Sequence, residues 1–295
     1  MFSTSSRGGI LGQGRNLASR EPKPETQNRE SFAGVALGHL WSVLDSSRLF
    51  FQRLVPPRYV PGLVSIPIAT YDRQDVLVTR TIPSLLESSY RNIEIIVICD
   101  GGPEIVRRSV EGLGDDRISF IQLKKRSRYP SDPLNLWFVA GSRPRNIGAR
   151  RARGEFILWM SDDDILLPKA LNSLVSYLRE NPAIDAVGGT VQVGTMNPTF
   201  NIPSENPDRI GIQTGAMPAW LHRRHLKAFK WNPHSWRNHW NRPADYDLAN
   251  RMLRKRIRFG AIDEVVVIQA EVADSGQLGS KAAIWEELRR RDGKR

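Results

Sequence analysis

The chain has 295 residues, 40% of them hydrophobic, and a formal net charge of +12 at pH 7. It is long enough for one large domain with a buried core, and no apolar run reaches the length of a membrane span. The single cysteine, Cys99, excludes an intramolecular disulfide framework, so we expect a reducing, cytoplasmic location. The positive charge favours a polyanionic partner but does not choose among nucleic acid, anionic lipid, a phosphorylated substrate and an acidic polysaccharide.

The two ends of the chain differ in composition from its middle. Residues 1–30 contain almost no large apolar side chains, which predicts a disordered tail. Across residues 31–57 apolar residues recur at helical spacing until Pro56 and Pro57, which predicts an amphipathic helical segment. Its Trp and Phe side chains, beside arginines, favour peripheral contact through residues 32–55 with the inner face of an anionic membrane; docking on the main domain is the alternative. Residues 271–295 are predicted to form a basic helical tail.

From Leu63 onward, strand and helix patterns alternate, which predicts an α/β fold with a mixed, mostly parallel sheet and helices on both faces. The predicted strands are Leu63–Ala69, Ile93–Cys99, Ile118–Leu123, Glu155–Met160, Ala186–Val191 and Val265–Ile268. The predicted helices are Gln74–Ser88, Pro103–Glu111, Arg145–Arg153, Lys169–Glu180 and Asp245–Arg254. The segment Lys124–Gly141 is expected to be a long loop, and loops of this length are often functional.

Three consecutive carboxylates, Asp162, Asp163 and Asp164, follow the predicted strand that ends at Met160. The carboxyl ends of parallel strands are where open α/β sheets bind ligands. Adjacent carboxylates repel one another unless a cation joins them, and Mg²⁺ or Mn²⁺ prefers such oxygen ligands. The triplet therefore predicts a divalent metal site, with a simple helix N-cap as the alternative.

Polar residues also follow the first two predicted strands. Thr70, Asp72 and Arg73 come after the first strand, and Asp100 with Gly101 and Gly102 comes after the second. In neighbouring parallel strands these groups meet in one crevice, where carboxylates accept hydrogen bonds from a base and from ribose hydroxyls. A helix cap at Asp72 and an ordinary Asp-Gly-Gly turn remain alternatives.

The order of these motifs resembles that of the family 2 glycosyltransferases, which have the GT-A fold, a Rossmann-like α/β architecture. The motifs are Val64-Ser65-Ile66-Pro67 with Thr70-Tyr71-Asp72-Arg73, Glu94–Val97 with Asp100-Gly101-Gly102, Arg145-Asn146-Ile147-Gly148, the acidic triplet, and Ala244-Asp245-Tyr246-Asp247-Leu248. We expect the domain to span residues 58–270. The resemblance implies transfer of a sugar from a nucleotide-sugar, usually a UDP-sugar, to an acceptor hydroxyl with inversion at the anomeric carbon.

The resemblance also implies roles for particular residues. The nucleotide-sugar is expected to contact Thr70, Asp72, Arg73, Asp100, Arg145, Asn146, Asp162 and Gly215. Asp163 is expected to ligate the divalent metal, Mn²⁺ or Mg²⁺, with Asp164 as a further ligand. The acceptor is expected to be a glycan, a lipid-linked molecule or another hydroxyl compound, with no specific nucleic-acid partner.

Asp245 matches the family's general base, which takes the proton from the acceptor hydroxyl. A general base needs a fixed position within hydrogen-bond reach, and Asp245 follows Pro243 at the start of a predicted helix. A first-turn acid stabilised by the helix dipole is the alternative. The chain departs from the family at Ser161 and Ala244, where an acid is common, and it has no histidine after His239 to reach the diphosphate. Gln269, Ser275, Gln277 and Lys281 are candidates to replace that histidine.

Other features leave alternatives open. Four tryptophans, at 220, 231, 236 and 240, could form a platform for a sugar or pack in the core. His222 and His225 lack zinc-ligand spacing with cysteine and are expected on the surface of a helix. A dinucleotide oxidoreductase is excluded because no strand precedes Gly12 and Gly14. A catalytically inactive GT-A-like protein that binds polyanions through its basic surface is the main alternative function.

Overall fold

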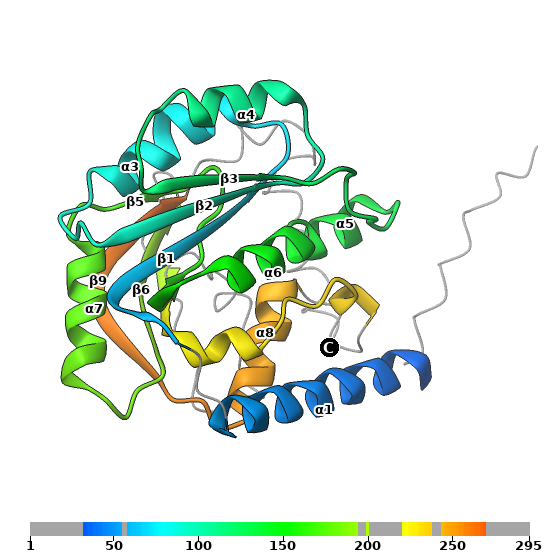
Figure 1. Ribbon diagram of the computed structural model, residues 1–295. Coiled ribbons are helices and arrows are strands. Elements are labelled where there is room, and N and C mark those ends of the chain that lie inside the picture. Colours follow the sequence, from blue (N-terminus) through cyan, green and yellow to red (C-terminus); the bar gives the residue numbers. More distant parts are fainter. Residues whose placement is uncertain (1–31, 55–57, 194–198, 201–219, 238–242, 270–295) are drawn as a thin grey trace, which may run out of the picture.

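The computed structural model describes residues 32–54, 58–193, 199–200, 220–237 and 243–269; the predicted tails lie outside these ranges (Figure 1). The strands are β1 (Val60–Thr70), β2 (Ile93–Cys99), β3 (Ile118–Gln122), β4 (Gly154–Leu158), β5 (Ile165–Leu166), β6 (Ala186–Val193), β7 (Thr199–Phe200), β8 (Trp220–Arg223) and β9 (Phe259–Gln269). The α-helices are α1 (Phe32–Leu54), α2 (Gln74–Val76), α3 (Ile82–Leu86), α4 (Glu104–Glu111), α5 (Pro133–Val139), α6 (Ser142–Arg151), α7 (Ala170–Glu180) and α8 (Ala244–Arg254). A π-helical turn, η1 (Leu77–Thr81), joins α2 to α3, and two 3₁₀ turns are η5 (Arg224–Ala228) and η6 (Ser235–Arg237).

The described strands form one mixed sheet in the order β3-β2-β1-β4-β8-β6-β9-β5, with β7 paired to β6. The four strands β3, β2, β1 and β4 run parallel to one another, and β6 runs parallel to β9. Strand β8 is antiparallel to both β4 and β6, so it joins the two parallel parts. Helices α3 and α4 cover one face of the β1–β3 half and α6 covers the other (Figure 1). The predicted α/β class with helices on both faces is confirmed.

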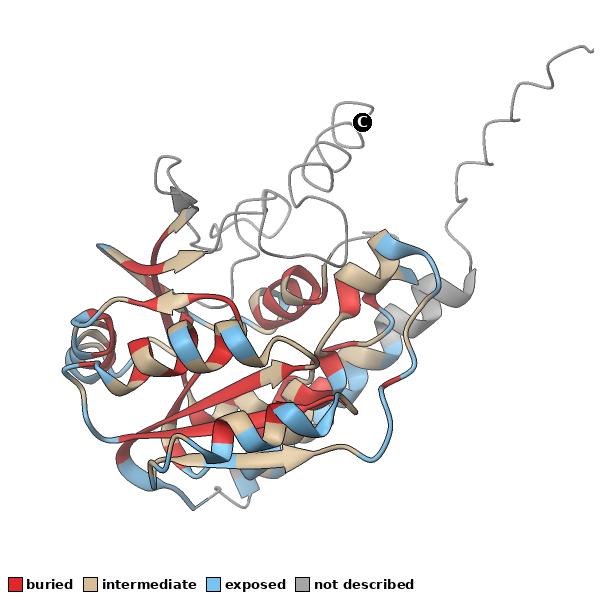
Figure 2. Cartoon of the chain, turned by 90° about the horizontal axis from the view of Figure 1, so that it is seen from above, coloured by how far each residue is buried: buried red, intermediate tan, exposed pale blue. Residues whose placement is uncertain are grey.

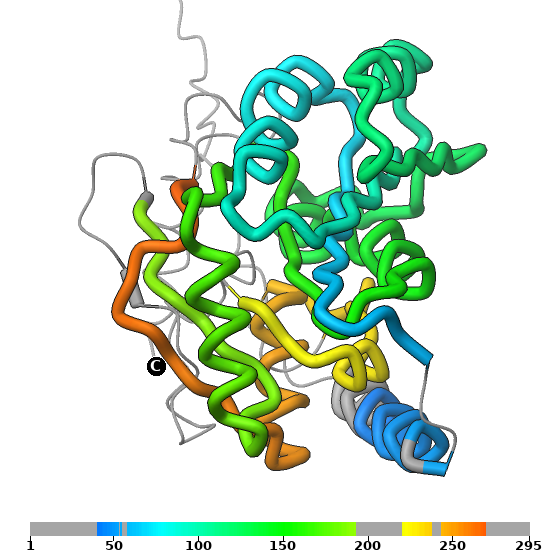
Figure 3. The backbone as a smooth tube through the Cα atoms, turned by 60° about the vertical axis from the view of Figure 1, so that its left-hand side comes forward, coloured from blue at the N-terminus to red at the C-terminus, as the bar shows by residue number. Residues whose placement is uncertain are grey.

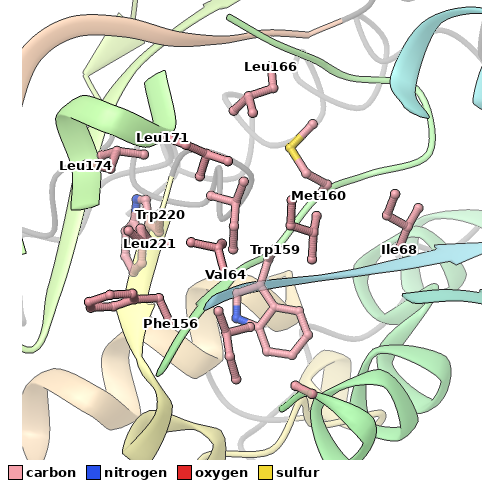
Figure 4. Packing of buried hydrophobic residues seen from close by; sticks show 14 of the residues in the cluster. Val64, Ile68, Phe156, Trp159, Met160, Leu166, Leu171, Leu174, Trp220 and Leu221 are labelled. Atoms are coloured by element: carbon pink, nitrogen blue, oxygen red, sulfur yellow. The ribbon is translucent and has the colours of Figure 1, made fainter. Parts of the chain in front are cut away.

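The core lies between the sheet and these helices. Every residue of β2 is buried, as expected for a β-branched strand covered on both faces. Figure 2 shows buried strands beneath helices whose outer faces are exposed. On the same sheet, Phe156, Trp159 and Met160 pack with Val64 and Ile68 of β1, close to where the acidic triplet begins (Figure 4). The triplet therefore follows directly from the buried core of the domain.

Two local predictions were wrong. The segment Lys124–Gly141 is not all loop, because α5 forms within it; the Asp132 carboxylate accepts a hydrogen bond of 2.8 Å from the backbone N–H of Asn135, and Pro133 begins the helix. His222 is not on a helix surface but in β8, where its side chain is 1% exposed. Burial lowers the pKa of His222 to about 4, so this imidazole is neutral at physiological pH.

Helix α1 packs against the domain through a buried charge network. Asp45, which is fully buried, accepts a hydrogen bond from the guanidinium of Arg251 in α8, and Arg251 also donates to Asp247 at 2.8 Å and to the Lys230 carbonyl. Burial disfavours the charged form of Arg251, but Asp247 and Asp45 outweigh it and raise its pKa. Figure 3 shows α1, in blue, beside the yellow segment that contains η5. Docking on the domain, the alternative left open above, is therefore observed.

In the part of the chain that the structure describes, no helix is long and apolar enough to cross a membrane.

Replacing Asp45 by alanine is expected to lower the free energy of unfolding by about 3 kcal/mol, because Arg251 would keep a buried charge with one partner removed. Urea unfolding followed by circular dichroism measures this change. Glu104→Ala is the matched control, since Glu104 is more than half exposed and forms an ion pair with the neighbouring Arg107; its loss should cost less than about 0.5 kcal/mol. Equal losses in both variants would contradict the proposed importance of the buried network.

Candidate active site

The carboxyl ends of β2, β1 and β4 lie side by side. Thr70 is paired with Cys99, and the backbone N–H of Asp100 donates to the Thr70 carbonyl at 2.8 Å. Met160, just after β4, forms a parallel bridge with Ile68 of β1. The polar residues that follow these three strands are therefore brought to one edge of the sheet, as predicted.

Arg73 joins two members of the acidic triplet. Its Nη1 atom lies 2.8 Å from Oδ2 of Asp163 and 3.5 Å from Oδ1 of Asp162. Burial and the neighbouring Asp163 raise the pKa of Asp162 to about 6, although Arg73, the Thr70 hydroxyl and Arg145 oppose this rise. Burial and the like charge of Asp163 thus make the ionised form of Asp162 less favourable than in water, while Arg73, the Thr70 hydroxyl and Arg145 stabilise it.

Asp164 is the most deeply placed of the three acids, with 1% of its surface exposed. Its carboxylate contributes to the electrostatic field at Arg145, as does that of Asp162. Asp72, which precedes Arg73, adds to the negative field at that guanidinium. Arginine and carboxylate groups therefore alternate through the crevice rather than forming separate patches.

Arg145 lies at the centre of this arrangement. Its Nη1 atom donates to the Ala140 carbonyl at 2.8 Å, and its guanidinium carbon lies 4.7 Å from the centroid of the Trp231 ring. Burial lowers the pKa of Arg145, and the strongest opposing influence is the carboxylate of Asp245, followed by Asp162. One guanidinium is therefore close to both the acidic triplet and Asp245, which are about 80 residues apart in the chain.

Asp245 occupies the first turn of α8, as the sequence predicted for the helix start. Its Oδ1 atom accepts a hydrogen bond of 2.8 Å from the backbone N–H of Tyr246. Burial raises the pKa of Asp245 to about 6, while this backbone bond and Arg145 restrain the rise. A fixed carboxylate with a pKa just below neutrality is suited to general-base work, because it is ionised near pH 7 yet accepts a proton readily.

Asp100 organises the loop that precedes α5. Its carboxylate is 4% exposed and accepts hydrogen bonds from the Ser127 hydroxyl at 2.6 Å, the Ser127 backbone N–H at 3.1 Å and the Tyr129 hydroxyl at 2.5 Å. Burial and the Asp100 carboxylate raise the pKa of Tyr129 to about 12. Ser127 and Tyr129 were not singled out in the sequence, because nothing local marks them as partners of a residue almost 30 positions away.

Gly102 allows this loop to close over the first strand. A Cβ atom on Gly102 would lie 1.6 Å from the Tyr71 carbonyl oxygen, so no other residue fits there. On the other side of the loop, the guanidinium carbon of Arg126 lies 3.9 Å from the Tyr71 ring centroid. The absence of a side chain at Gly102 therefore serves packing against Tyr71.

Asn146 braces Trp231. The Asn146 amide donates to the Trp231 carbonyl at 2.8 Å and accepts from the Trp231 backbone N–H at 2.9 Å. Trp231 is 3% exposed and meets Trp159 edge to face, with centroids 5.4 Å apart. Trp220 is also buried, against Phe259. Core packing, one of the two alternatives, therefore accounts for these two tryptophans, and Trp231 supports Arg145.

The predicted metal ligands meet chemical requirements for a hard cation but do not form a closed cage. Among the described residues, no group of three or more His, Cys, Asp or Glu side chains is arranged to hold a metal. Mg²⁺ and Mn²⁺ sites that act on phosphates commonly use only one or two carboxylates, and the substrate supplies further oxygens. Asp163, with Asp162 or Asp164 beside it, fits such an open site.

Several predicted contacts lie outside the described residues: Gly215, Trp240, Ser275, Gln277 and Lys281. Gln269 ends β9 and is partly exposed.

Carboxylates and arginines gather at the strand ends of a mixed α/β sheet, which is where open α/β folds bind their ligands. The profile of glycosyl transferase family 2 matches residues 65–257, and the chain belongs to this family. The resemblance found in the sequence is thereby confirmed.

Relatives with similar sequences are bacterial and archaeal. The chain is 30% identical over 122 residues to GalNAc(5)-diNAcBac-PP-undecaprenol beta-1,3-glucosyltransferase of Campylobacter jejuni, covering 41% of this chain and 36% of that protein. It is 26% identical over 129 residues to glucosyl-dolichyl phosphate glucuronosyltransferase of Haloferax volcanii, covering 43% and 38%. The matched segments thus span less than two fifths of the length of these two relatives.

Solved structures support the fold. Residues 1–349 of TarS from S. aureus, crystallised with UDP-GlcNAc, superpose with a TM-score of 0.55 at 16% identity, covering 73% of this chain and 60% of that one. The complex of the same protein with UDP gives a TM-score of 0.54 at 15% identity, covering 70% and 60%. At this identity the similarity establishes the GT-A-type fold of the chain.

Replacing Asp245 by asparagine is expected to stabilise the protein at pH 8 and to have little effect near pH 3. The pKa of about 6, against an ordinary value of 3.8, means that the folded state binds this proton more tightly than the unfolded chain, so the native protein loses stability as pH rises from about 4 to about 6. The variant also loses the favourable interaction of a first-turn charge with the helix dipole. The net gain in the free energy of unfolding at pH 8 should therefore be about 1–2 kcal/mol, as urea unfolding can measure. Asp116→Asn, at an exposed position outside the crevice, is the control; a gain of the same size there would refute the argument.

Proposed function

We propose that the chain is an inverting glycosyltransferase that transfers a sugar from a UDP-sugar to an acceptor hydroxyl, with a divalent metal and with Asp245 as general base. The observation that supports the proposal is that one buried guanidinium, that of Arg145, interacts with the charges of both Asp245 and Asp162. Donor activation and acceptor deprotonation must take place within a few ångströms of each other, on opposite sides of the anomeric carbon. Family membership supplies the reaction class.

The donor nucleotide is assigned to the strand-end crevice. Thr70, Asp72 and Asp100 are proposed to contact the nucleoside, and Gly215 is proposed to line the sugar site. Arg73, Arg145 and Asn146 are proposed to lie near the diphosphate or ribose, where the two guanidiniums supply positive charge in a partly buried setting. TarS, which shares the fold, binds UDP and UDP-GlcNAc, and this favours a uridine nucleotide.

The divalent cation, Mn²⁺ or Mg²⁺, is assigned to Asp163 as direct ligand, with Asp164 as the second carboxylate and Asp162 directed toward ribose or sugar. The ion would neutralise charge that develops on the departing diphosphate. Arg73 already contacts Asp163 at 2.8 Å and holds its carboxylate at the mouth of the crevice. The raised pKa of Asp162 is consistent with a site that gains from added positive charge.

Asp245 is proposed to accept the proton of the acceptor hydroxyl as that oxygen attacks the anomeric carbon. Its Oδ1 atom is held by the Tyr246 backbone, which leaves Oδ2 for the proton. Arg145 limits how far burial raises the pKa of Asp245, so the carboxylate remains ionised at neutral pH.

For the acceptor we propose a hydroxyl on a saccharide joined to a polyprenyl phosphate or diphosphate. Two relatives have names that contain undecaprenol and dolichyl phosphate, respectively. A basic chain suits an acceptor that carries phosphate, whereas a neutral glycan would gain nothing from a net charge of +12.

UDP is expected to bind in the presence of Mn²⁺ and to lose at least about tenfold in affinity when the metal is chelated, as titration calorimetry can measure. Asp163→Asn should weaken the Mn²⁺-dependent binding by a similar factor, and Asp116→Asn should leave it unchanged. If neither the chelator nor Asp163→Asn changes the affinity for UDP, the metal takes no part in donor binding. Absence of binding to UDP, GDP and dTDP would favour the alternative of an inactive, polyanion-binding protein.

Asp245→Asn is expected to lower kcat by about 10²- to 10⁴-fold, because the amide cannot accept the acceptor proton. UDP affinity should change little in this variant, which separates base catalysis from donor binding. The rate of UDP release by the native chain should rise with pH through about 6, since the protonated carboxyl cannot act as a base. A variant that keeps the native rate and pH profile would exclude Asp245 as the base.

A further inference from the structure

Helix α1 has two faces of opposite character. Its inner face carries Trp41, Asp45 and Leu49; Asp45 is fully buried against Arg251, and Leu49 packs on the core. The opposite face carries large apolar side chains that are 36–65% exposed: Leu40, Val43, Leu44, Phe50, Phe51 and Leu54. We call these six residues the outer stripe of α1. Because they recur at intervals of three, four and seven positions, they lie along one side of the helix.

The outer stripe concentrates the exposed apolar surface of the molecule. Of nine large hydrophobic side chains that are exposed within the described residues, six belong to it. Two of the others, Tyr59 and Val60, follow shortly after α1, and Ile105 stands alone on α4. Scattered exposed hydrophobics are normal in proteins, but a contiguous row about 20 Å long marks a contact surface.

Cations border the outer stripe on both sides. Arg48 is one turn from Leu44 and Phe51, and it is 33% exposed. On the other border, Ser46 accepts a hydrogen bond of 2.6 Å from Nζ of Lys255, one turn from Val43 and Phe50. Burial, together with Arg48 and Lys227, lowers the pKa of Lys230 to about 8, so further positive charge lies close to Arg48.

We propose that the outer stripe of α1 binds the interfacial layer of an anionic lipid bilayer. The phenylalanine and leucine side chains would enter the boundary between headgroups and acyl chains, and the bordering cations would contact lipid phosphates. A second copy of the chain is a poorer occupant, because pairing of two stripes would bring Arg48 and Lys255 of one copy against the same charges of the other. An anionic surface turns those charges into favourable contacts.

The buried network on the inner face allows the helix to stay docked while the stripe is engaged. Turning the stripe outward requires no rearrangement, since Asp45 and Trp41 already hold the inner face on α8. The bound helix would therefore place α8, and with it Asp245, at a fixed orientation to the membrane. The inference stands independently of sugar transfer, because it rests on α1 and the cations beside it and uses no residue of the proposed active site.

Vesicle flotation tests the proposal with the full chain. Native protein should float with vesicles of phosphatidylcholine and phosphatidylglycerol and much less with phosphatidylcholine alone. Phe50→Ser/Phe51→Ser should lower the partition coefficient on anionic vesicles about tenfold or more. Ile105→Ser, which removes an exposed apolar side chain on α4, should bind as the native chain does. Thermal unfolding and Mn²⁺-dependent UDP binding should be unchanged in the double variant, which shows that the fold and the donor site are intact.

A second measurement identifies other occupants of the stripe. Phe51→Cys introduces a thiol at an exposed position, and this thiol should react with a charged maleimide in the free protein. Cys99, the one native cysteine, is fully buried and should not react. Anionic vesicles should protect the new thiol from the maleimide. No labelling in the free protein would mean that another segment of the chain or a second copy covers the stripe. Sedimentation equilibrium then separates these two, and either result overturns the proposal. Three results of the flotation assay would also overturn the proposal. They are no flotation of the native chain, an equal loss of binding in Ile105→Ser, and equal binding of the native chain to neutral vesicles.

Discussion

The arrangement of the site depends on one buried guanidinium, which interacts with the charges of both Asp245 and the acidic triplet. Arg145 emerges from the first half of α6, donates to the Ala140 carbonyl and lies over the ring of Trp231. Its charge acts on both Asp245 and the acidic triplet, and Arg73 adds a second positive charge beside Asp163. Much of the surrounding structure serves this placement: Asn146 fixes the backbone of Trp231, and Trp159 buttresses the Trp231 ring from beneath. The two halves of the proposed chemistry are therefore joined by packing as well as by charge.

A second guanidinium performs a comparable task away from the crevice. Arg251 ties α1, the carbonyl of Lys230 and the first turn of α8 into one unit, and it does so through atoms that are almost completely excluded from water. Buried ionic groups of this kind add little net stability relative to apolar packing, but they tolerate few alternative arrangements. This network therefore defines the position of α8, and through it the direction in which Asp245 faces. The family profile begins at residue 65, yet the electrostatic environment of α8 includes a residue from α1.

Much of the fold could be predicted from the sequence, because β-branched runs such as Ile93–Cys99 and amphipathic segments such as α7 carry their own periodicity. The meeting of Thr70, Asp100 and the acidic triplet followed from strand order alone. The predictions failed where distant pairing outweighs local pattern. The basic segment around His222 looks helical but is a strand, since it completes the sheet between β4 and β6. Helix α5 was not predicted, although Asp132 and Pro133 are good helix-start residues, because its seven residues are too few to show a helical period. No local signal could reveal that Asp100 would hold Tyr129, or that Arg251 would find Asp45.

The pairing of Asp45 with Arg251 also has a consequence for how the chain matures. The two residues are 206 positions apart, so α1 is synthesised long before its partner in α8 exists. During that interval the helix has neither its buried counter-charge nor its docking surface, and both its faces are open to solvent, to chaperones and to lipid. Joining residues this far apart costs more conformational entropy than pairing near neighbours such as β1 and β2. The helix therefore waits through the synthesis of most of the domain before the contact that orients α8 can form.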